Sequence, residues 1–252
     1  MTRPSLLPLL GLLLALTRPA MAGPLDCPQA AMPVLRLPSV AAALAAGRPL
    51  RIVALGSSST EGVGASSRGA TYPAQLEADL RAALPGQEIE VINKGVSGQD
   101  ASEMLQRLES DALSLHPTLL IWQVGVNGAL RRNSPLRFRE MITAGVDQAR
   151  AAGVDVLLMD SQRGAWARAA PERAAFDQVL ADLADLPGVA LFPRGALMDA
   201  WTARGAPPEA MLIPDGLHHN DRGYACLSAA VAEAMIDGVP RAHAATLATS
   251  SR

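Results

Sequence analysis

The chain has 252 residues with a formal net charge of −2, and 49% of its residues are hydrophobic. Its 22 basic and 24 acidic residues form no basic stripe, so the sequence argues against a nucleic-acid partner. This length suits one large α/β domain or two small ones, and neither a linker-like change of composition nor an internal repeat divides it.

The first 22 residues have the order of a secretory signal peptide. A basic start is followed by an apolar run over residues 6–16 and by the small-residue ending AMA at residues 20–22. The run is shorter than the roughly 20 apolar residues of a membrane span, although a retained anchor helix is the alternative. Cleavage removes Arg3 and Arg18 and moves the formal charge from −2 to −4. We therefore predict a periplasmic or secreted protein without stable membrane insertion.

Both cysteines, Cys27 and Cys226, remain after that cleavage. An even number of cysteines in an oxidising compartment favours a disulfide, which here would join the mature N-terminus to a late helix. Two free, half-buried thiols are the alternative, because the sequence gives no distance between the two side chains.

The remaining chain divides into an extension, a main domain and a tail. Residues 23–49 are rich in proline and alanine and contain one predicted helix over residues 39–47, with Ser39 as its N-cap. Residues 50–240 form the predicted main domain, and residues 241–252 are predicted to be a disordered tail.

Five short apolar runs in the main domain predict five strands. They lie at residues 51–55, 89–92, 119–124, 154–159 and 189–192. Their mostly continuous apolar character is typical of strands that are buried on both faces of a sheet.

Helical patterns separate these strands and follow the last one. They cover residues 71–84, 100–113, 135–152, 171–186 and 221–236. In the first of them Thr71 is placed to cap the helix, and apolar side chains recur every four residues along one face. The alternation predicts a five-stranded parallel sheet covered by helices on both faces, a three-layer α/β/α fold.

Four polar, glycine-rich loops follow strands or precede the last helix. They lie at residues 56–64 (GSSSTEGVG), 93–98, 125–128 and 215–220. Since the strands of a parallel sheet all point one way, we expect these loops to meet at one edge, where α/β folds place their ligand sites. Taken alone, the first loop is better explained as an ordinary polar turn.

Asp215 and His218 stand three residues apart in the last of these loops. At that spacing a carboxylate can reach one ring nitrogen of the histidine and leave the other nitrogen free as a base. Taken alone, the pair is better explained as a helix cap beside a surface histidine.

Together the four loops resemble the SGNH, or GDSL-type, hydrolase family, over residues 50–238. The family's glycine-aspartate-serine block corresponds to Gly56-Ser57-Ser58, and its glycine-x-asparagine-aspartate block corresponds to residues 125–128. Its aspartate-x-x-histidine block corresponds to residues 215–218, and its second block supplies a glycine in the GVSG stretch.

The resemblance implies a flavodoxin-like SGNH hydrolase fold and a serine esterase that works through an acyl-enzyme. It implies Ser58 as the nucleophile, His218 as the base and Asp215 as the acid that orients the base. It also implies an oxyanion hole, a set of donors for the developing negative charge, formed by the backbone of Ser58 and Gly98 and the side chain of Asn127.

Three positions depart from the family pattern. Ser57 and Gly128 stand where the family has aspartates, and both losses are expected to loosen the loops that hold the reacting groups. His219 stands where the family often has proline, and we interpret it as a residue on the rim of the site.

Few aromatic residues lie near these loops, so we predict a small-molecule ester with a short acyl chain as the substrate. Thioesters and lysophospholipids stay open, and the oligomeric state is unknown. Trp122 and Met159 are predicted core residues, and no spacing suggests a metal or another cofactor. The competing functions are a phosphate or nucleotide binder that uses the serine-rich loop, and a non-catalytic ligand- or carbohydrate-binding protein on the same fold.

Overall fold

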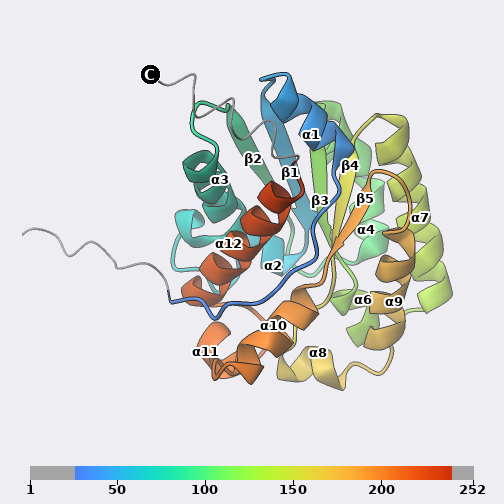
Figure 1. The fold of residues 1–252 in the computed structure, drawn as a ribbon. Coiled ribbons are helices and arrows are strands. Elements are labelled where there is room, and N and C mark those ends of the chain that lie inside the picture. Colours follow the sequence, from blue (N-terminus) through green and yellow to red (C-terminus); the bar gives the residue numbers. More distant parts are fainter. Residues whose placement is uncertain (1–25, 240–252) are drawn as a thin grey trace, which may run out of the picture.

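The computed structural model describes residues 26–239, so the predicted signal peptide and the predicted tail lie outside the described residues. A five-stranded parallel sheet with the order β2-β1-β3-β4-β5 forms the centre of the molecule (Figure 1). The strands are β1 (Leu50–Gly56), β2 (Ile89–Gly95), β3 (Leu119–Gln123), β4 (Asp155–Met159) and β5 (Val189–Phe192). The prediction of a five-stranded parallel sheet is confirmed.

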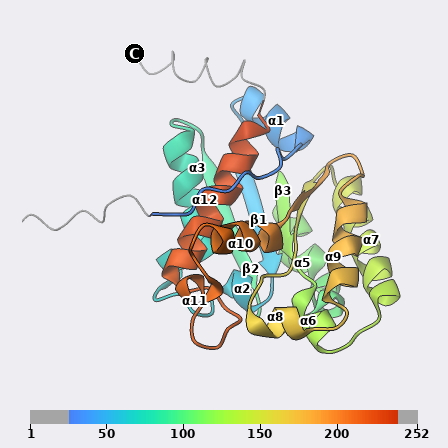
Figure 2. The ribbon, with the colours of Figure 1, turned by 60° about the horizontal axis from the view of Figure 1, so that its bottom comes forward.

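Helices cover both faces of this sheet (Figures 1 and 2). The α-helices are α1 (Pro38–Ala45), α2 (Ser58–Glu61), α3 (Tyr72–Ala83), α4 (Ala101–Gln106), α5 (Leu108–Asp111), α6 (Val126–Leu130), α7 (Pro135–Ala151), α8 (Ala165–Ala169), α9 (Arg173–Leu183), α10 (Arg194–Ala203), α11 (Pro208–Met211) and α12 (Asp221–Asp237). Two short 3₁₀ helices, η1 (Arg68–Ala70) and η2 (Leu113–Leu115), complete the set.

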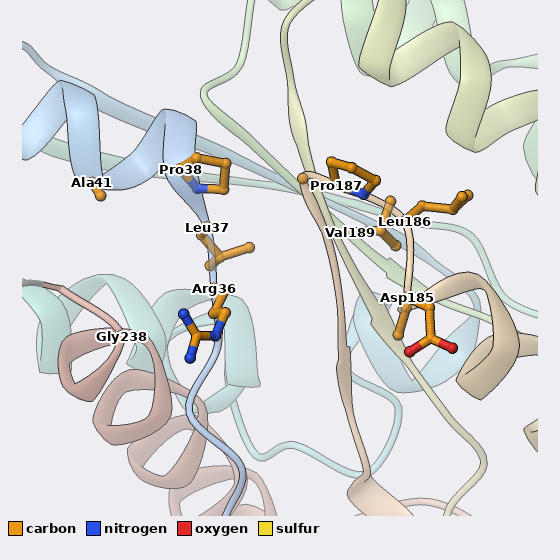
Figure 3. A pocket seen from close by; sticks show the side chains of 11 residues that line it. Arg36, Leu37, Pro38, Ala41, Asp185, Leu186, Pro187, Val189 and Gly238 are labelled. Atoms are coloured by element: carbon orange, nitrogen blue, oxygen red, sulfur yellow. The ribbon is translucent and has the colours of Figure 1, made fainter.

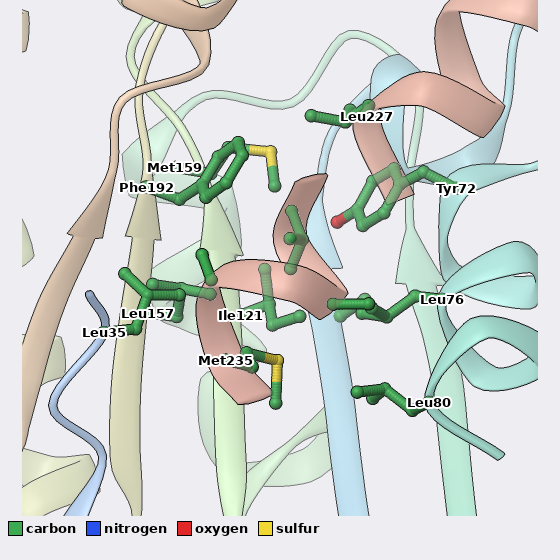
Figure 4. Close-up of a cluster of buried hydrophobic side chains, with 14 of the residues drawn as sticks. Leu35, Tyr72, Leu76, Leu80, Ile121, Leu157, Met159, Phe192, Leu227 and Met235 are labelled. Carbon is green, nitrogen blue, oxygen red and sulfur yellow. The ribbon is translucent and has the colours of Figure 1, made fainter. Parts of the chain in front are cut away.

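The apolar runs become central strands because their side chains alternate between two cores. On β1, Ile52 and Ala54 join one buried cluster, whereas Val53 and Leu55 join the other. The first cluster lies between the sheet and helices α1, α3, α10 and α12, where Leu76, Leu227 and their neighbours pack together (Figure 4). The second lies beneath α4, α5, α7 and α9. A strand that is apolar on both faces is thus buried from both sides, as expected for a parallel sheet.

Two predicted helix features are wrong in detail. Helix α1 begins at Pro38 without a side-chain cap, and Ser39 instead donates its hydroxyl hydrogen to the carbonyl oxygen of Gly153 at 3.0 Å. Thr71 does precede α3, but its hydroxyl donates to the carbonyl of Arg68 rather than capping the helix. Both hydroxyls are drawn away by carbonyl groups outside their own helix.

The predicted helix over residues 100–113 is broken into α4, α5 and η2. Asp100 and Glu103 form a capping box that starts α4, but the helix stops at Arg107. The guanidinium of Arg107 donates to the carbonyls of Gly56 and Lys94, at the ends of two strands. Long-range contacts therefore accompany the break, and local helix preference does not reveal them.

An N-terminal segment runs along α12 and is tied to it at both ends. Cys27 forms a disulfide with Cys226, and the backbone N–H of Leu35 donates to the carbonyl of Ala234 at 3.3 Å. The structure thus contains the bridge that the sequence left open. Within residues 26–239, no helix combines the length and the apolar character needed to cross a bilayer.

Candidate active site

The turn after β1 places Ser58 at the carboxyl edge of the sheet. Gly56 ends the strand, and a Cβ atom on it would lie 2.0 Å from the hydroxyl oxygen of Thr60, so no larger residue fits there. The next turn of chain forms α2, whose first residue is the half-buried Ser58. Figure 2 shows α2, α6 and α8 at this same end of the molecule.

Ser58, His218 and Asp215 form a continuous chain of hydrogen bonds. The Oγ atom of Ser58 lies 2.7 Å from Nε2 of His218, although 160 positions separate the two residues in the sequence. The other ring nitrogen of His218, Nδ1, lies 2.6 Å from Oδ2 of Asp215. The structure therefore brings the three predicted catalytic side chains into direct contact.

The loop around Asp215 is arranged to hold a carboxylate. Its Oδ1 atom accepts hydrogen bonds from the backbone N–H groups of Leu217 and His218, at 2.8 and 3.0 Å. Burial pushes the pKa of Asp215 upward, but these bonds and the bond from the His218 ring outweigh it, so the pKa is lowered from its usual value. An ionised Asp215 accepts a hydrogen bond from Nδ1–H, which keeps the proton on that nitrogen and leaves the Nε2 lone pair directed at Ser58.

The predicted oxyanion residues lie on neighbouring segments. Asn127, on α6, donates one amide hydrogen to the carbonyl of Gln99 at 2.8 Å, next to Gly98. Gly98 has a φ of +81°, a conformation that favours glycine, and its carbonyl accepts a hydrogen bond from Arg131 at 2.7 Å. The structure therefore joins the Gly98 loop to α6, while the oxyanion role of Gly98 and Asn127 stays a prediction.

Gln123, at the end of β3, holds the nucleophile turn from beneath. Its side-chain oxygen accepts from the backbone N–H of Ser57 at 3.0 Å, from the Ser57 hydroxyl at 3.1 Å and from the Thr60 hydroxyl at 3.1 Å. The sequence predicted that Ser57, in place of the family's aspartate, would loosen this turn. Instead, two hydrogen bonds from Ser57 to Gln123 hold it. Nothing in the sequence pattern distinguishes Gln123 from an ordinary residue at a strand end.

Gly128 is likewise enclosed. A Cβ atom on Gly128 would lie 2.7 Å from the ring of Phe176, so this glycine lets α6 approach α9 closely. Asn133, just after α6, donates to Asp100 at 3.0 Å and ties this region to the start of α4. Close packing thus replaces whatever an aspartate would contribute at this position.

His219 is not a rim residue, and that interpretation is wrong. Its side chain is fully buried, its Nδ1 atom lies 3.1 Å from the carbonyl oxygen of Met211, and its ring packs edge-on against Trp201 and Tyr224. Burial, with a smaller effect from the charge of Arg194, lowers its pKa to about 3. His219 is therefore a very weak base, and its enclosed ring has no access to a substrate, so it does not act as a second base beside His218.

A set of buried polar side chains lies beneath His219. Arg194 is fully buried and donates to the carbonyl of Asp160 at 3.0 Å and to the side-chain oxygen of Gln162 at 2.6 Å. Burial and then the charge of Asp177 raise the pKa of Asp160 to about 7. Gln162 also donates to the carbonyl of Leu217 at 3.2 Å, so this group supports the loop that carries Asp215. Trp122 and Met159 are fully buried, as predicted for core residues.

The triad of Ser58, His218 and Asp215 lies apart from one sizeable cavity. Residues 26–239 contain no group of three or more His, Cys, Asp or Glu side chains that could hold a metal ion. A cavity of about 460 Å³ lies at the opposite, amino-terminal edge of the sheet, between Arg36, Pro187 and Gly238 (Figure 3). None of the three triad side chains lines this cavity.

The chain is similar in sequence to a family of lipase-like proteins and to an esterase. The profile described as the non-GDSL lipase-like family matches residues 25–241. The esterase TesA of Pseudomonas aeruginosa is 30% identical over 82 residues, which are 32% of this chain and only 41% of TesA.

Solved structures share the fold. The lipase/acylhydrolase from Enterococcus faecalis superposes with a TM-score of 0.63 at 23% identity and covers 75% of this chain and 96% of its own. Axe2, an acetylxylan esterase from Geobacillus stearothermophilus, gives a TM-score of 0.63 at 22% identity, with 73% and 93% covered. LAE5, an α/β hydrolase enzyme from the metagenome of Lake Arreo, gives 0.64 at 18% identity, with 77% and 99% covered.

Proposed function

The chain belongs to the non-GDSL lipase-like family, and we propose that it is a serine hydrolase that cleaves carboxylic esters through an acyl-enzyme. One observation carries the proposal. The hydroxyl of Ser58, both ring nitrogens of His218 and the carboxylate of Asp215 form one line of short hydrogen bonds. That line is what a nucleophilic serine needs, because a bare hydroxyl is a weak nucleophile until a positioned base removes its proton.

In the first half of the reaction, Nε2 of His218 takes the proton of Ser58 as Oγ attacks the ester carbonyl. Asp215 holds the Nδ1–H and stabilises the imidazolium that forms. The tetrahedral intermediate collapses when His218 returns this proton to the oxygen of the leaving alcohol. The alcohol then departs, and the acyl group remains on Ser58.

The developing negative charge requires donors beside Ser58. We assign this role to the backbone N–H groups of Ser58 and Gly98 and to the side-chain amide of Asn127. Asn127 uses one amide hydrogen on Gln99, and its second hydrogen is then available to the oxyanion. Such donors stabilise the transition state because they are already oriented when the charge appears.

In the second half, water replaces the alcohol. His218 removes a proton from the attacking water, and the tetrahedral intermediate collapses as His218 returns that proton to Oγ of Ser58. The carboxylic acid is released and the serine is restored. The same three side chains therefore serve both halves of the cycle.

We propose a short acyl chain as the preferred substrate group. A long chain needs a continuous apolar surface beside the nucleophile. Large apolar side chains are well exposed at four positions of the described chain that are separate in the sequence, which are Val34, Val96, Leu136 and Trp166. A panel of p-nitrophenyl esters from acetyl to palmitoyl tests this point, and a maximum of kcat/KM at palmitoyl would contradict it.

The alternative of a binding protein without catalysis is less well supported. A protein that only binds a ligand has no need to pair Ser58 with His218. Both hydrogen bonds of the triad are nevertheless present. The two family aspartates that are absent are replaced by the contacts of Gln123 and Phe176 described above. A phosphate binder likewise gives Asp215 no role.

We also propose that the protein works in the periplasm or outside the cell. The pattern of residues 1–22 and the disulfide between Cys27 and Cys226 both support this compartment. Peptide mapping under reducing and non-reducing conditions tests the bridge, and cell fractionation tests the compartment. Two free thiols in the folded, secreted protein would contradict the first point, and a cytoplasmic location would contradict the second.

The central experiment asks which serine reacts. A fluorophosphonate probe should label Ser58, and Ser58→Ala should abolish both labelling and the burst of p-nitrophenol from an activated ester. Ser57→Ala and Ser59→Ala are the matched controls and should retain the burst. Wild-type activity in Ser58→Ala, with loss in either control, would show that the nucleophile is assigned to the wrong residue.

A further inference from the structure

Glu61 ends the short helix that begins with Ser58 and reaches across to the loop that follows β2. Its Oε2 atom accepts a hydrogen bond from the backbone N–H of Ser97 at 2.8 Å and a second, shorter one from the Ser97 hydroxyl. Glu61 has no part in the sequence pattern that identified the reacting groups. One carboxylate oxygen thus holds the residue that immediately precedes Gly98.

Two further contacts hold α2 against the end of β2. Asn93 donates its side-chain amide to the carbonyl of Thr60 at 2.7 Å. A Cβ atom on Gly95 would lie 1.9 Å from the backbone nitrogen of Glu61, so only glycine allows this approach. The loop therefore leaves β2 in contact with the helix that carries the nucleophile.

Beyond Gly95 the backbone N–H of Val96 donates to the carbonyl of Gly56 at 3.0 Å, and the next support on that side is the contact of Ser97 with Glu61. Ser97 and Gly98 are exposed, and Gly98 has a positive φ, which glycine adopts about as readily as a negative one, so its backbone is not fixed by its own preference. On the far side, Arg131 binds the carbonyl of Gly98 and Asn127 binds that of Gln99. Of the contacts that tie Ser97 and Gly98 back toward Ser58, the Glu61 carboxylate is the charged one, and hydrogen bonds to a charged group are the stronger ones.

We propose that Glu61 is a positioning residue: by holding Ser97, it sets the direction of the Gly98 backbone N–H toward the oxyanion that forms at Ser58. This inference rests on the proposed function. Glu61 touches neither the substrate nor the reacting atoms in this scheme. Its effect belongs to the transition state, because an oxyanion donor acts only once the charge develops.

The test compares turnover, substrate binding and oxyanion binding in the same variants. Glu61→Ala should lower kcat on p-nitrophenyl acetate by about 10- to 100-fold, since small misplacements of a reacting geometry have effects of this size. KM should stay within about two-fold of wild type, which is the signature of an interaction made in the transition state. The inhibition constant of a methyl trifluoromethyl ketone, whose serine adduct carries an oxyanion, should rise by the same factor as kcat falls.

Two variants and one control separate positioning from folding. Glu61→Gln keeps the side-chain length and one acceptor oxygen, so it should recover most of the lost kcat. Adding Ser97→Ala to Glu61→Ala should cause little further loss, because the two residues act through one contact. Glu90→Ala is the control, since Glu90 is an exposed carboxylate on β2 that pairs with Arg51; its kcat should equal that of wild type.

The outcomes are distinguishable from failure of the proposed function. A wild-type protein that neither hydrolyses the ester nor binds the ketone overturns the proposed function and this inference with it. An active wild type with unchanged kcat in a folded Glu61→Ala, or with a loss confined to KM, overturns the positioning role alone. If Glu61→Ala does not fold, Glu61→Met decides, because it keeps the side-chain length but offers no oxygen acceptor to Ser97, and a wild-type ketone inhibition constant there rejects the inference.

Discussion

The site has two layers that differ in their exposure to water, and each layer contains one of two consecutive histidines, His218 and His219. The surface triad, Ser58, Asp215 and His218, is partly open to water, with 39% of the Asp215 side chain and 14% of the His218 side chain exposed. The buried polar layer beneath it, Gln123, Arg194 and His219, is fully enclosed. Burial disfavours the charged form of a histidine, so the enclosed imidazole of His219 is held neutral, whereas His218 keeps contact with water. Exposure therefore decides which of the two histidines can act as a base.

The buried polar layer is costly, because polar groups lose water when they are enclosed. Its side chains compensate in part by binding the backbone that carries the triad, although Gln123, Arg194 and His219 each keep one buried nitrogen without a hydrogen-bond partner among the described residues. Gln123 holds the turn before Ser58, and Arg194 binds Gln162, which in turn binds the loop of Asp215. If this comparison is right, changes in the surface triad alter rate with little effect on stability, and changes in the buried polar layer alter stability first.

The largest expected effect is that of Ser58→Ala. Loss of the nucleophile should lower kcat by about 10⁴-fold or more, in line with the loss of other serine nucleophiles. The melting temperature should stay near that of wild type, since Ser58 is half-buried and its hydroxyl contributes one exchangeable hydrogen bond. Steady-state assay and thermal melting measure the two effects. A large fall in stability would show that the surface triad is also a structural element and would blur the division into layers.

Asn127→Ala should have the next largest effect. Removal of one oxyanion donor typically costs about 10²–10³ in turnover, or roughly 2.7–4 kcal/mol of transition-state stabilisation. Asn133→Ala, on the same connection, is the matched control, because Asn133 donates to Asp100 and not to the Gly98 loop. A pair of equal, small losses in the two variants would argue against an oxyanion role for Asn127.

The strands could be predicted from the sequence because each depends on a local pattern, whereas the candidate site residues are predicted from the family resemblance of four loops taken together. The apolar run at residues 51–55 specifies a buried strand whatever surrounds it, and parallel strands bring their following loops to one edge. The burial of His219 could not be predicted, since it depends on Trp201 and Tyr224 from two other elements. The break at Arg107 likewise depends on distant carbonyl groups. Helix α10 is absent from the predicted helices although its buried residues Leu197, Met198 and Trp201 stand at helical spacing. Helix α11 has only four residues, which is too short for an apolar period to show.

Gln123→Leu tests the contact between the two layers. The change leaves the Ser57 N–H and the hydroxyls of Ser57 and Thr60 without their acceptor, so stability should fall by about 2–4 kcal/mol. The rate should fall by only about ten-fold, as a secondary effect of a less fixed turn. Urea unfolding and kcat measure these effects, with the exposed Gln178→Leu as a control that should alter neither. A loss of rate without a loss of stability would place Gln123 functionally in the surface triad.

The smallest expected effect is a change in how the free energy of unfolding depends on pH. It distinguishes two buried groups, His219 and Asp160. The folded-state pKa of His219 is lowered to about 3, so the unfolded chain binds more protons than the folded one between roughly pH 3 and 6.5, and stability from this group rises with pH there. The pKa of Asp160 is raised to about 7, so the folded chain binds more protons between roughly pH 4 and 7, and stability from this group falls as pH rises.

These two trends oppose each other between roughly pH 4 and 6.5, so the stability that His219 and Asp160 together contribute should change little across that range. His219→Gln should unmask the fall, making the protein less stable at pH 6.5 than at pH 4.5, relative to wild type. Asp160→Asn should unmask the rise, with the opposite sign, and the double variant should return toward the flat profile. Urea midpoints at the two pH values measure this, with kcat as the check that the surface triad is intact. Equal profiles in all four proteins would mean that neither group is enclosed in solution, and the contrast between the two histidines would then have no physical basis.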